Sequence, residues 1–288
     1  MRFIFSTVIL LLFVPLLRGQ EAKPFLIYNA KGKKTSYKKL LKSAARADVI
    51  FFGEEHNNTI AHWLELKLTA DMYRIKNGKI ILGAEMFERD NQEALTRYVS
   101  GEIDEKQLDS LARLWPNFEK DYKPLVDFAR KHRLPFIATN IPRRYASLVY
   151  KKGFGALDSL SKKEKQWIMP LPVAYDSTLS QYRRMLEMMK AHGHTNPNLP
   201  KAQAVKDATM AHSIAENLKD GHTFIHYNGS YHSAFDQGII WYLRRLKPGI
   251  KILTVEVVSQ KDIRKFDPEL KHTADFIIIT DETFPKSY

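Results

Sequence analysis

The sequence contains no cysteine. This absence excludes disulfide bonds, and it also excludes the lipid that exported lipoproteins carry on a cysteine. The chain shows neither an internal repeat of fixed period nor a low-complexity segment. With 288 residues, 44% of them hydrophobic, it is long enough to bury a sizeable core. We therefore expect a fold that its core alone stabilises.

Several functional motifs are also missing. There is no Gly-x-Ser-x-Gly nucleophile elbow, no Walker phosphate-binding loop and no recognisable nucleic-acid-binding motif. The net charge is +13, but the basic residues occur in short, dispersed groups such as Lys38-Lys39 and Arg143-Arg144. A dispersed excess favours general attraction to anionic surfaces or substrates, so we expect no nucleic-acid partner.

The amino terminus has the pattern of an export signal. Arg2 precedes an apolar run over residues 3–17, which is short for a bilayer span and typical of a signal peptide. We predict a signal peptide over residues 1–20, with cleavage between Gly19 and Ala22, and an uncleaved signal anchor is the alternative. The protein is accordingly expected to be exported, in the periplasm or at the cell surface, without a lipid anchor.

The rest of the chain, residues 21–288, reads as a single domain of alternating strands and helices. Predicted strands cover residues 47–52, 79–85, 134–140, 223–228, 251–258 and 275–280. Helical patterns cover residues 60–75, 91–101, 105–115, 122–133, 143–153 and 232–246. This alternation predicts an α/β fold, with a mostly parallel sheet flanked by helices on both faces.

The segment from about 156 to 218 departs from this rhythm. It has no strand candidate, two long helical patterns, and a joint rich in Pro, Gly and Asn at 193–200. We predict a helical insertion, suited to form a lid or one wall of a ligand site.

Polar residues cluster where the predicted strands end. Ligands of open α/β sheets bind at the carboxyl ends of the strands, so these side chains are expected to converge on one edge. They are Glu54, Glu55, His56, Glu85, Asn140, Arg143, Asn228 and His232. Two of the strand ends carry the same motif, Gly-x-x-His, in GEEH (53–56) and GSYH (229–232). We predict a functional role for both histidines, whereas helix capping by Asn57, Asn58 and Ser233 is the structural explanation of the turns.

Two chemistries fit this set of residues. His56, Glu85 and His232 suit a divalent metal ion such as Zn, Mn or Co, with Arg143 available to hold an oxyanion or carboxylate. Glu54 or Glu55 would then orient a histidine or act as a base. The alternative is a metal-free site in which His56 or His232 moves protons.

The motifs GEEH, AEMFER, TNIPRR, AQAVKDATMAHSIAENL and NGSYH resemble the ChaN-type haem-binding uptake family of the Tiki superfamily. That superfamily includes TraB-like proteins and erythromycin esterases, and the resemblance covers roughly residues 45–260. It implies a polar centre made of His56, Glu85, Arg143 and His232, with Glu54 completing the first motif.

The same resemblance implies an exported protein of haem or iron acquisition that binds haem between two subunits and serves an outer-membrane uptake system. It also leaves a hydrolase open, because the superfamily includes metal-dependent proteolytic and hydrolytic members. ChaN-type proteins are often lipoproteins, and the lack of cysteine is a departure from that pattern.

Haem binding requires an apolar slot, an axial ligand and often cations near the propionates. The ligand candidates are His56, Tyr175, Tyr231 and His232. The insertion also supplies Tyr182, Met185, Met188, Met189, His192 and His194, and Gln203 and Asp207 lie where they could face the site. Core packing is the alternative for the Tyr and Met residues, and a solvated helix face is the alternative for Gln203 and Asp207.

Overall fold

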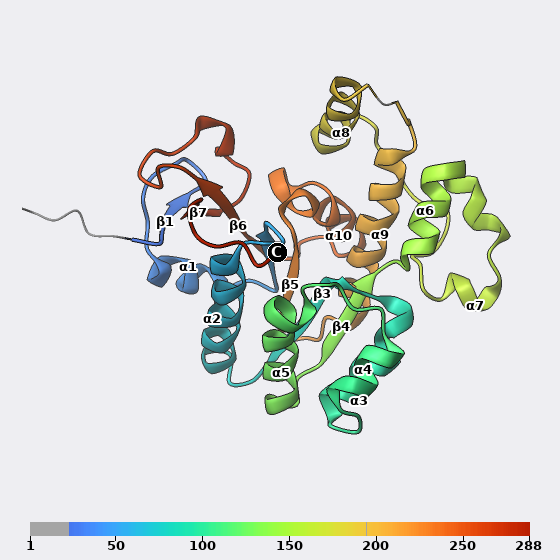
Figure 1. The fold of residues 1–288 in the computed structure, drawn as a ribbon, viewed down its shortest axis with the longest axis horizontal. Coiled ribbons are helices and arrows are strands. Elements are labelled where there is room, and N and C mark those ends of the chain that lie inside the picture. Colours follow the sequence, from blue (N-terminus) through green and yellow to red (C-terminus); the bar gives the residue numbers. More distant parts are fainter. Residues whose placement is uncertain (1–22, 194) are drawn as a thin grey trace, which may run out of the picture.

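Seven strands form one sheet in the order β1-β7-β6-β2-β5-β3-β4 (Figure 1). The structure is a computed structural model that describes residues 23–193 and 195–288. The strands are β1 Phe25–Asn29, β2 Val49–Glu54, β3 Ile80–Glu88, β4 Phe136–Asn140, β5 Thr223–Gly229, β6 Ile252–Gln260 and β7 Phe276–Asp281. All neighbouring pairs are parallel except β1 with β7. The predicted, mostly parallel sheet is confirmed, and β1 is an additional edge strand that the sequence reading missed.

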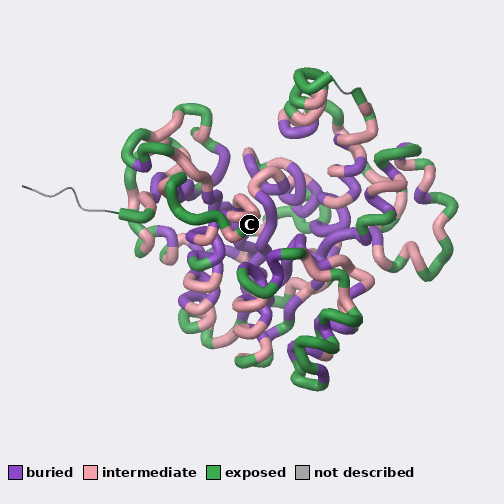
Figure 2. The backbone as a smooth tube through the Cα atoms, in the orientation of Figure 1, coloured by how far each residue is buried: buried purple, intermediate pink, exposed green. Residues whose placement is uncertain are grey.

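Helices cover both faces of this sheet. They are α1 Tyr37–Ala44, α2 Thr59–Ile75, α3 Gln92–Ser100, α4 Glu105–Leu111, α5 Lys123–His132, α6 Arg143–Lys152, α7 Lys162–Lys165, α8 Ser180–Ala191, α9 Leu199–Asn217 and α10 Ile239–Leu246. Alternate residues of β2 point to opposite faces. Ile50 and Phe52 pack in the cluster that includes α1 to α5, and Val49 and Phe51 pack with α9 and α10. The central strands are buried on both sides, as Figure 2 shows in purple.

The predicted insertion forms helices and contains no strand within its described residues. Its last helix, α9, lies on the sheet beside β4 and also packs against α6, α8 and α10. Eleven residues of α9 are buried, including the polar Asp207 and Ser213. The helix is therefore enclosed by the fold, and it brings polar side chains into the interior.

The chain path places a ligand-binding position at β5. β5 lies between β2 and β3 in the sheet. From β2 the chain passes through α2 to β3, which lies beyond β5. From β5 it passes through α10 to β6, which lies beyond β2 in the opposite direction. Connections thus leave β2 and β5 in opposite directions. In open α/β sheets, such a switch point opens a crevice at the carboxyl ends of the strands.

Two predicted helix boundaries are wrong. The helix expected over 232–246 begins only at Ile239, because Phe235 and Asp236 adopt left-handed backbone angles with φ of 60° and 57°. His232 instead ends a short 3-10 turn, Ser230–His232. The helix expected over 105–115 ends at Leu111, which agrees with Pro116 disfavouring the helical conformation at the residue before it.

No helix among the described residues is both long and apolar enough to cross a membrane. The predicted signal peptide, residues 1–20, and His194 lie outside the described residues.

Candidate functional site

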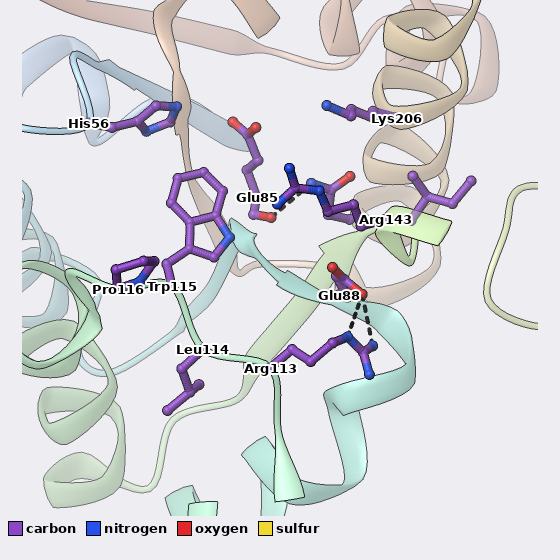
Figure 3. Close-up of a pocket in the computed structure, with 11 residues that line it drawn as sticks. His56, Glu85, Glu88, Arg113, Leu114, Trp115, Pro116, Arg143 and Lys206 are labelled. Carbon is purple, nitrogen blue, oxygen red and sulfur yellow. Dashed lines mark hydrogen bonds and ion pairs between the residues drawn. The ribbon is translucent and has the colours of Figure 1, made fainter. Parts of the chain in front are cut away.

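A cavity of about 570 Å³ opens at the carboxyl edge of the sheet, at the switch point. It is lined by His56, Glu85, Glu88, Arg113, Leu114, Trp115, Pro116, Asn140, Ile141, Arg143 and Lys206. Figure 3 shows His56 and Glu85 projecting toward each other, with the Trp115 indole beside them and Lys206 and Arg143 on the opposite side from His56. Four of the eight polar residues expected at this edge therefore line one cavity together with Trp115.

His56 is held in place from behind. Its Nδ1 lies 2.8 Å from Oε1 of Glu54, and the hydroxyl of Tyr122 donates to the same oxygen at 2.7 Å. Trp115 meets the imidazole edge-on, with 4.9 Å between ring centroids. The side chain is still 32% exposed. Burial alone would lower the pKa of His56, but the hydrogen bond to Glu54 and the charge of Glu85 raise it.

Gly229 allows His56 to come close to β5. A Cβ atom at this position would lie 2.8 Å from Nε2 of His56 and 3.6 Å from Oε2 of Glu85. The backbone N–H of Gly229 donates to that same Glu85 oxygen at 2.9 Å. The glycine of GSYH is thus needed for space, because any side chain at this position would push His56 away from Glu85.

His232 forms a buried chain with two carboxylates. Its Nε2 lies 3.0 Å from Oε1 of Glu85, and its Nδ1 contacts Asp207, which also accepts a hydrogen bond from Tyr182 at 2.8 Å. Burial alone would lower the pKa of His232, but the charges of Glu85 and Asp207 raise it to about 9. Burial would raise the pKa of Glu85, but the charge of His232 lowers it to about 2. Both ring nitrogens of His232 are therefore engaged within the protein.

Two cations face the cavity without close partners. Arg143 is the first residue of α6, and Lys206 comes from α9. In the described part of the chain, neither side chain has a hydrogen bond or an ion pair, although Lys206 contributes to lowering the pKa of Glu85. Arg113, by contrast, is paired with Glu88 at 2.8 Å. Arg143 and Lys206 are thus available to an anionic ligand.

Other predicted residues lie away from the cavity lining. Glu55 bonds to Ser259, and Asn228 bonds to His226 and Ser233. Tyr175 stacks on Tyr182, with 5.7 Å between ring centroids, and the hydroxyl of Tyr231 donates to the backbone of Gln181. Gln203 and Asp207 do face His232, as one of the two interpretations expected.

The capping interpretation of the two turns is correct for one of them. Asn58 caps α2, accepting hydrogen bonds from the backbone N–H groups of Ile60 and Ala61. Ser233 makes no side-chain capping bond; its hydroxyl accepts from Asn228. The turn after β5 is instead packed tightly against its own chain, since a Cβ on Gly238 would lie 2.3 Å from the carbonyl oxygen of His232.

The sequence reading missed a second polar group beneath His56. His62 and Glu65 lie on one face of α2, and both are buried against Glu54. Burial alone would lower the pKa of His62, but hydrogen bonds with Glu54 and Glu65 raise it to about 11. Burial and the charge of Glu54 raise the pKa of Glu65 well above its usual range. The spacing of three residues between His62 and Glu65 was the available signal.

A family model described as "Haem-binding uptake, Tiki superfamily, ChaN" matches residues 40–243. The chain belongs to this family. This ChaN-family chain is similar in structure to ChaN of Campylobacter jejuni, whose structure is described as showing cofacial haem binding. The two are 19% identical with a TM-score of 0.68, over 89% of this chain and 97% of the other, so they share the α/β fold.

An erythromycin esterase mutant in its open conformation is also similar, at 9% identity and a TM-score of 0.43, over 88% of this chain and 83% of the other. No curated protein matches the sequence.

The Glu85–His232 pair predicts a pH-dependent stability. Because the pKa of His232 rises from about 6.5 to about 9 on folding, its contribution is complete below pH 6.5 and is lost as the pH rises through 9. We expect His232→Asn to lower the free energy of unfolding by about 3 kcal/mol near pH 6, and by less at pH 9. Urea denaturation at both pH values measures the difference.

His222→Asn is the matched control, because His222 immediately precedes β5 at the opposite edge of the sheet. It should change stability little at either pH. A deficit of His232→Asn that grows between pH 6.5 and 9 would contradict the assignment.

Proposed function

We propose that this protein binds haem in the cavity at the carboxyl edge of the sheet, with Nε2 of His56 as the ligand of the iron. The observation that carries the proposal is the His56–Glu54 hydrogen bond of 2.8 Å at Nδ1. Metal-ligating histidines almost always donate their other ring N–H to a carboxylate or carbonyl, which fixes the tautomer and leaves the second nitrogen free to bind. Membership of a haem-binding uptake family supports haem as the molecule that is bound.

The cavity has the composition that a porphyrin requires. Its volume of about 570 Å³ lies within the usual range of ligand pockets, and Leu114, Trp115 and Ile141 give it apolar walls. Arg143 and Lys206 supply positive charge for the two propionates. Haem would be the molecule that the protein carries, and His56 would bind its iron.

The other predicted haem ligands are less suitable in this structure. Both nitrogens of His232 are bonded to buried carboxylates, so binding iron would break one of those bonds. Tyr175 is packed between Phe154 and Tyr182. Tyr231 is half-buried, and its hydroxyl donates to the backbone of Gln181. His56 is the one candidate of the four that lines the cavity and keeps a ring nitrogen uncommitted.

A hemin titration tests this assignment. We expect wild-type protein to give a saturable shift of the Soret band, and His56→Ala to weaken hemin binding by about 100-fold, since the axial ligand is lost. Arg143→Gln should weaken binding by about 5- to 10-fold without altering the position of the Soret band, because it removes a propionate partner and leaves the ligand of the iron unchanged.

His222→Ala is the control, and it should bind hemin like the wild type. An unchanged affinity and spectrum in His56→Ala would overturn the choice of ligand, and the absence of any saturable change in the wild type would overturn haem binding itself. We further propose that haem is held between two subunits. Sedimentation of the hemin-loaded protein should then show a dimer, and a monomer with one haem would argue against this arrangement.

We also propose that the protein is exported and serves haem or iron uptake at an outer membrane, as the pattern of residues 1–20 suggests. If so, the mature protein recovered from the periplasm or cell surface begins between Gly19 and Ala22. Recovery of the full-length chain from the cytoplasm alone would refute export.

Hydrolysis is the second candidate, because Glu85 is placed between His56 and the buried His232–Asp207 pair. Such a chain can accept a proton at Glu85 or hold a water molecule for attack, with or without Zn, Mn or Co bound at His56, Glu85 and His232. It predicts turnover of ester or peptide substrates that Glu85→Gln reduces at least about 100-fold. Glu88→Gln, which alters another carboxylate of the same cavity, is the control and should retain most of the turnover. If the wild type hydrolyses none of these substrates with any of these metals, this candidate is eliminated.

A further inference from the structure

A second cluster of titratable groups lies behind His56, away from the cavity lining. It contains Glu54 at the end of β2 and His62 and Glu65 on α2, and all three are buried, with side-chain exposures of 0%, 6% and 0%. One oxygen of each carboxylate and one nitrogen of the imidazole lie within 4.8 Å of one another. The cluster therefore brings three metal-ligand atoms together in a place sheltered from water.

The orientation of His62 directs one nitrogen into this cluster. Its Nε2 lies 3.1 Å from the backbone oxygen of His56, which can only accept a hydrogen bond, so Nε2 carries a proton. Its Nδ1 faces Oε2 of Glu54 at 3.2 Å and Oε2 of Glu65 at 3.3 Å. A backbone carbonyl that holds the outer nitrogen is the usual support of a metal-binding histidine.

Two buried carboxylate oxygens at this point are poorly satisfied. Oε1 of Glu65 accepts no hydrogen bond from any described residue, and Oε2 of Glu54 has no donor of its own, because it shares Nδ1 of His62, 3.2 Å away, with Glu65. A single proton on Nδ1 can be directed at only one of the two neighbouring oxygens, so it leaves the other unsatisfied. Unpaired buried carboxylate oxygens are costly unless positive charge balances them.

We propose that Glu54, His62 and Glu65 bind a divalent cation such as Zn²⁺, through Oε2 of Glu54, Nδ1 of His62 and the carboxylate of Glu65. Binding would displace the protons that Nδ1 of His62 and Glu65 hold without the ion. The two carboxylates and the neutral imidazole that remain are neutralised by one dication, and this mixed oxygen and nitrogen set suits Zn²⁺. This site differs from the metal site that the sequence predicted at His56, Glu85 and His232. It lies behind His56, on the side away from the cavity.

A second depression adjoins the cluster at His62. This depression, of about 470 Å³, is lined by His62 and Asp121, together with Trp63, Pro124, Lys120 and Lys286. It shares no lining residue with the cavity assigned to haem. Asp121, whose Oδ2 lies 3.5 Å from Nε2 of His62, adds a carboxylate to the lining of this depression. A cation that approached from this side would meet Asp121 and His62 without passing through the larger cavity.

The bound cation would position His56. Glu54 contributes Oε2 to the cluster and Oε1 to Nδ1 of His56, so fixing one oxygen fixes the other. The ion would also link the end of β2 to the second turn of α2, since His62 and Glu65 come from that helix. Its role toward haem is therefore indirect.

Zinc titration of the chelator-treated full-length protein tests the proposal. We expect one Zn²⁺ per chain by elemental analysis, and a Glu65→Gln variant that binds zinc at least about 100-fold more weakly, because a ligand is removed. Glu256→Gln is the matched control: Glu256 is another buried glutamate with an unpartnered oxygen, on β6 and outside the cluster. It should bind zinc like the wild type.

The variants also separate this site from the haem site. Glu65→Gln should keep hemin binding within a few-fold of wild type, which shows that it folds, and His56→Ala should keep its zinc. Calorimetry in buffers of different ionisation enthalpy should show protons released on zinc binding. The proposal is overturned if wild type retains no stoichiometric zinc, if Glu65→Gln binds it normally, or if Glu85→Gln loses it while Glu65→Gln does not.

Discussion

The two oxygens of Glu54 connect everything that surrounds His56. One oxygen receives the hydroxyl of Tyr122 and faces Nδ1 of His56, and the other faces His62 beneath it. Burial alone would raise the pKa of this carboxyl, yet hydrogen bonds from the two histidines keep it below its usual range. A buried carboxylate with a fixed charge orients the imidazoles on both sides. The orientation of His56 toward the cavity thus depends on the last residue of β2.

The two Gly-x-x-His motifs have unlike roles despite their equal spacing. In the first, the histidine is partly exposed and the residue after the glycine holds it. In the second, the glycine gives room to the other motif's histidine, while His232 is buried between Glu85 and Asp207. The motifs meet because β2 and β5 are parallel neighbours with Gly53 beside Asn228. The first motif exposes the imidazole of His56 to the cavity, and the second provides Gly229, the backbone against which that imidazole packs.

Periodicity was enough to predict the parallel sheet. The rule that ligands bind at the carboxyl ends of strands predicted that polar residues meet there, and four of them, His56, Glu85, Asn140 and Arg143, do line one cavity. Trp115 was missed because the apolar pattern of 105–115 continues past Leu111, where the chain in fact leaves the helix. The helix after β5 was predicted to begin too early for a similar reason. Phe235 and Asp236 adopt left-handed backbone angles where the chain turns back, so that Gly238 packs against the backbone of His232. Local periodicity does not indicate a contact of this kind.

His62 and Glu65 were hidden for a different reason. On α2 they occupy inward-facing positions among Leu64, Leu68 and Met72, where an apolar residue would serve the packing of the sheet. Ionisable side chains at such positions reduce stability unless they pair with one another or with an ion. Packing of α2 against the sheet alone does not require ionisable residues at these two positions. Their burial against Glu54 indicates that the inner face of α2 supports the histidine above it as well as the core.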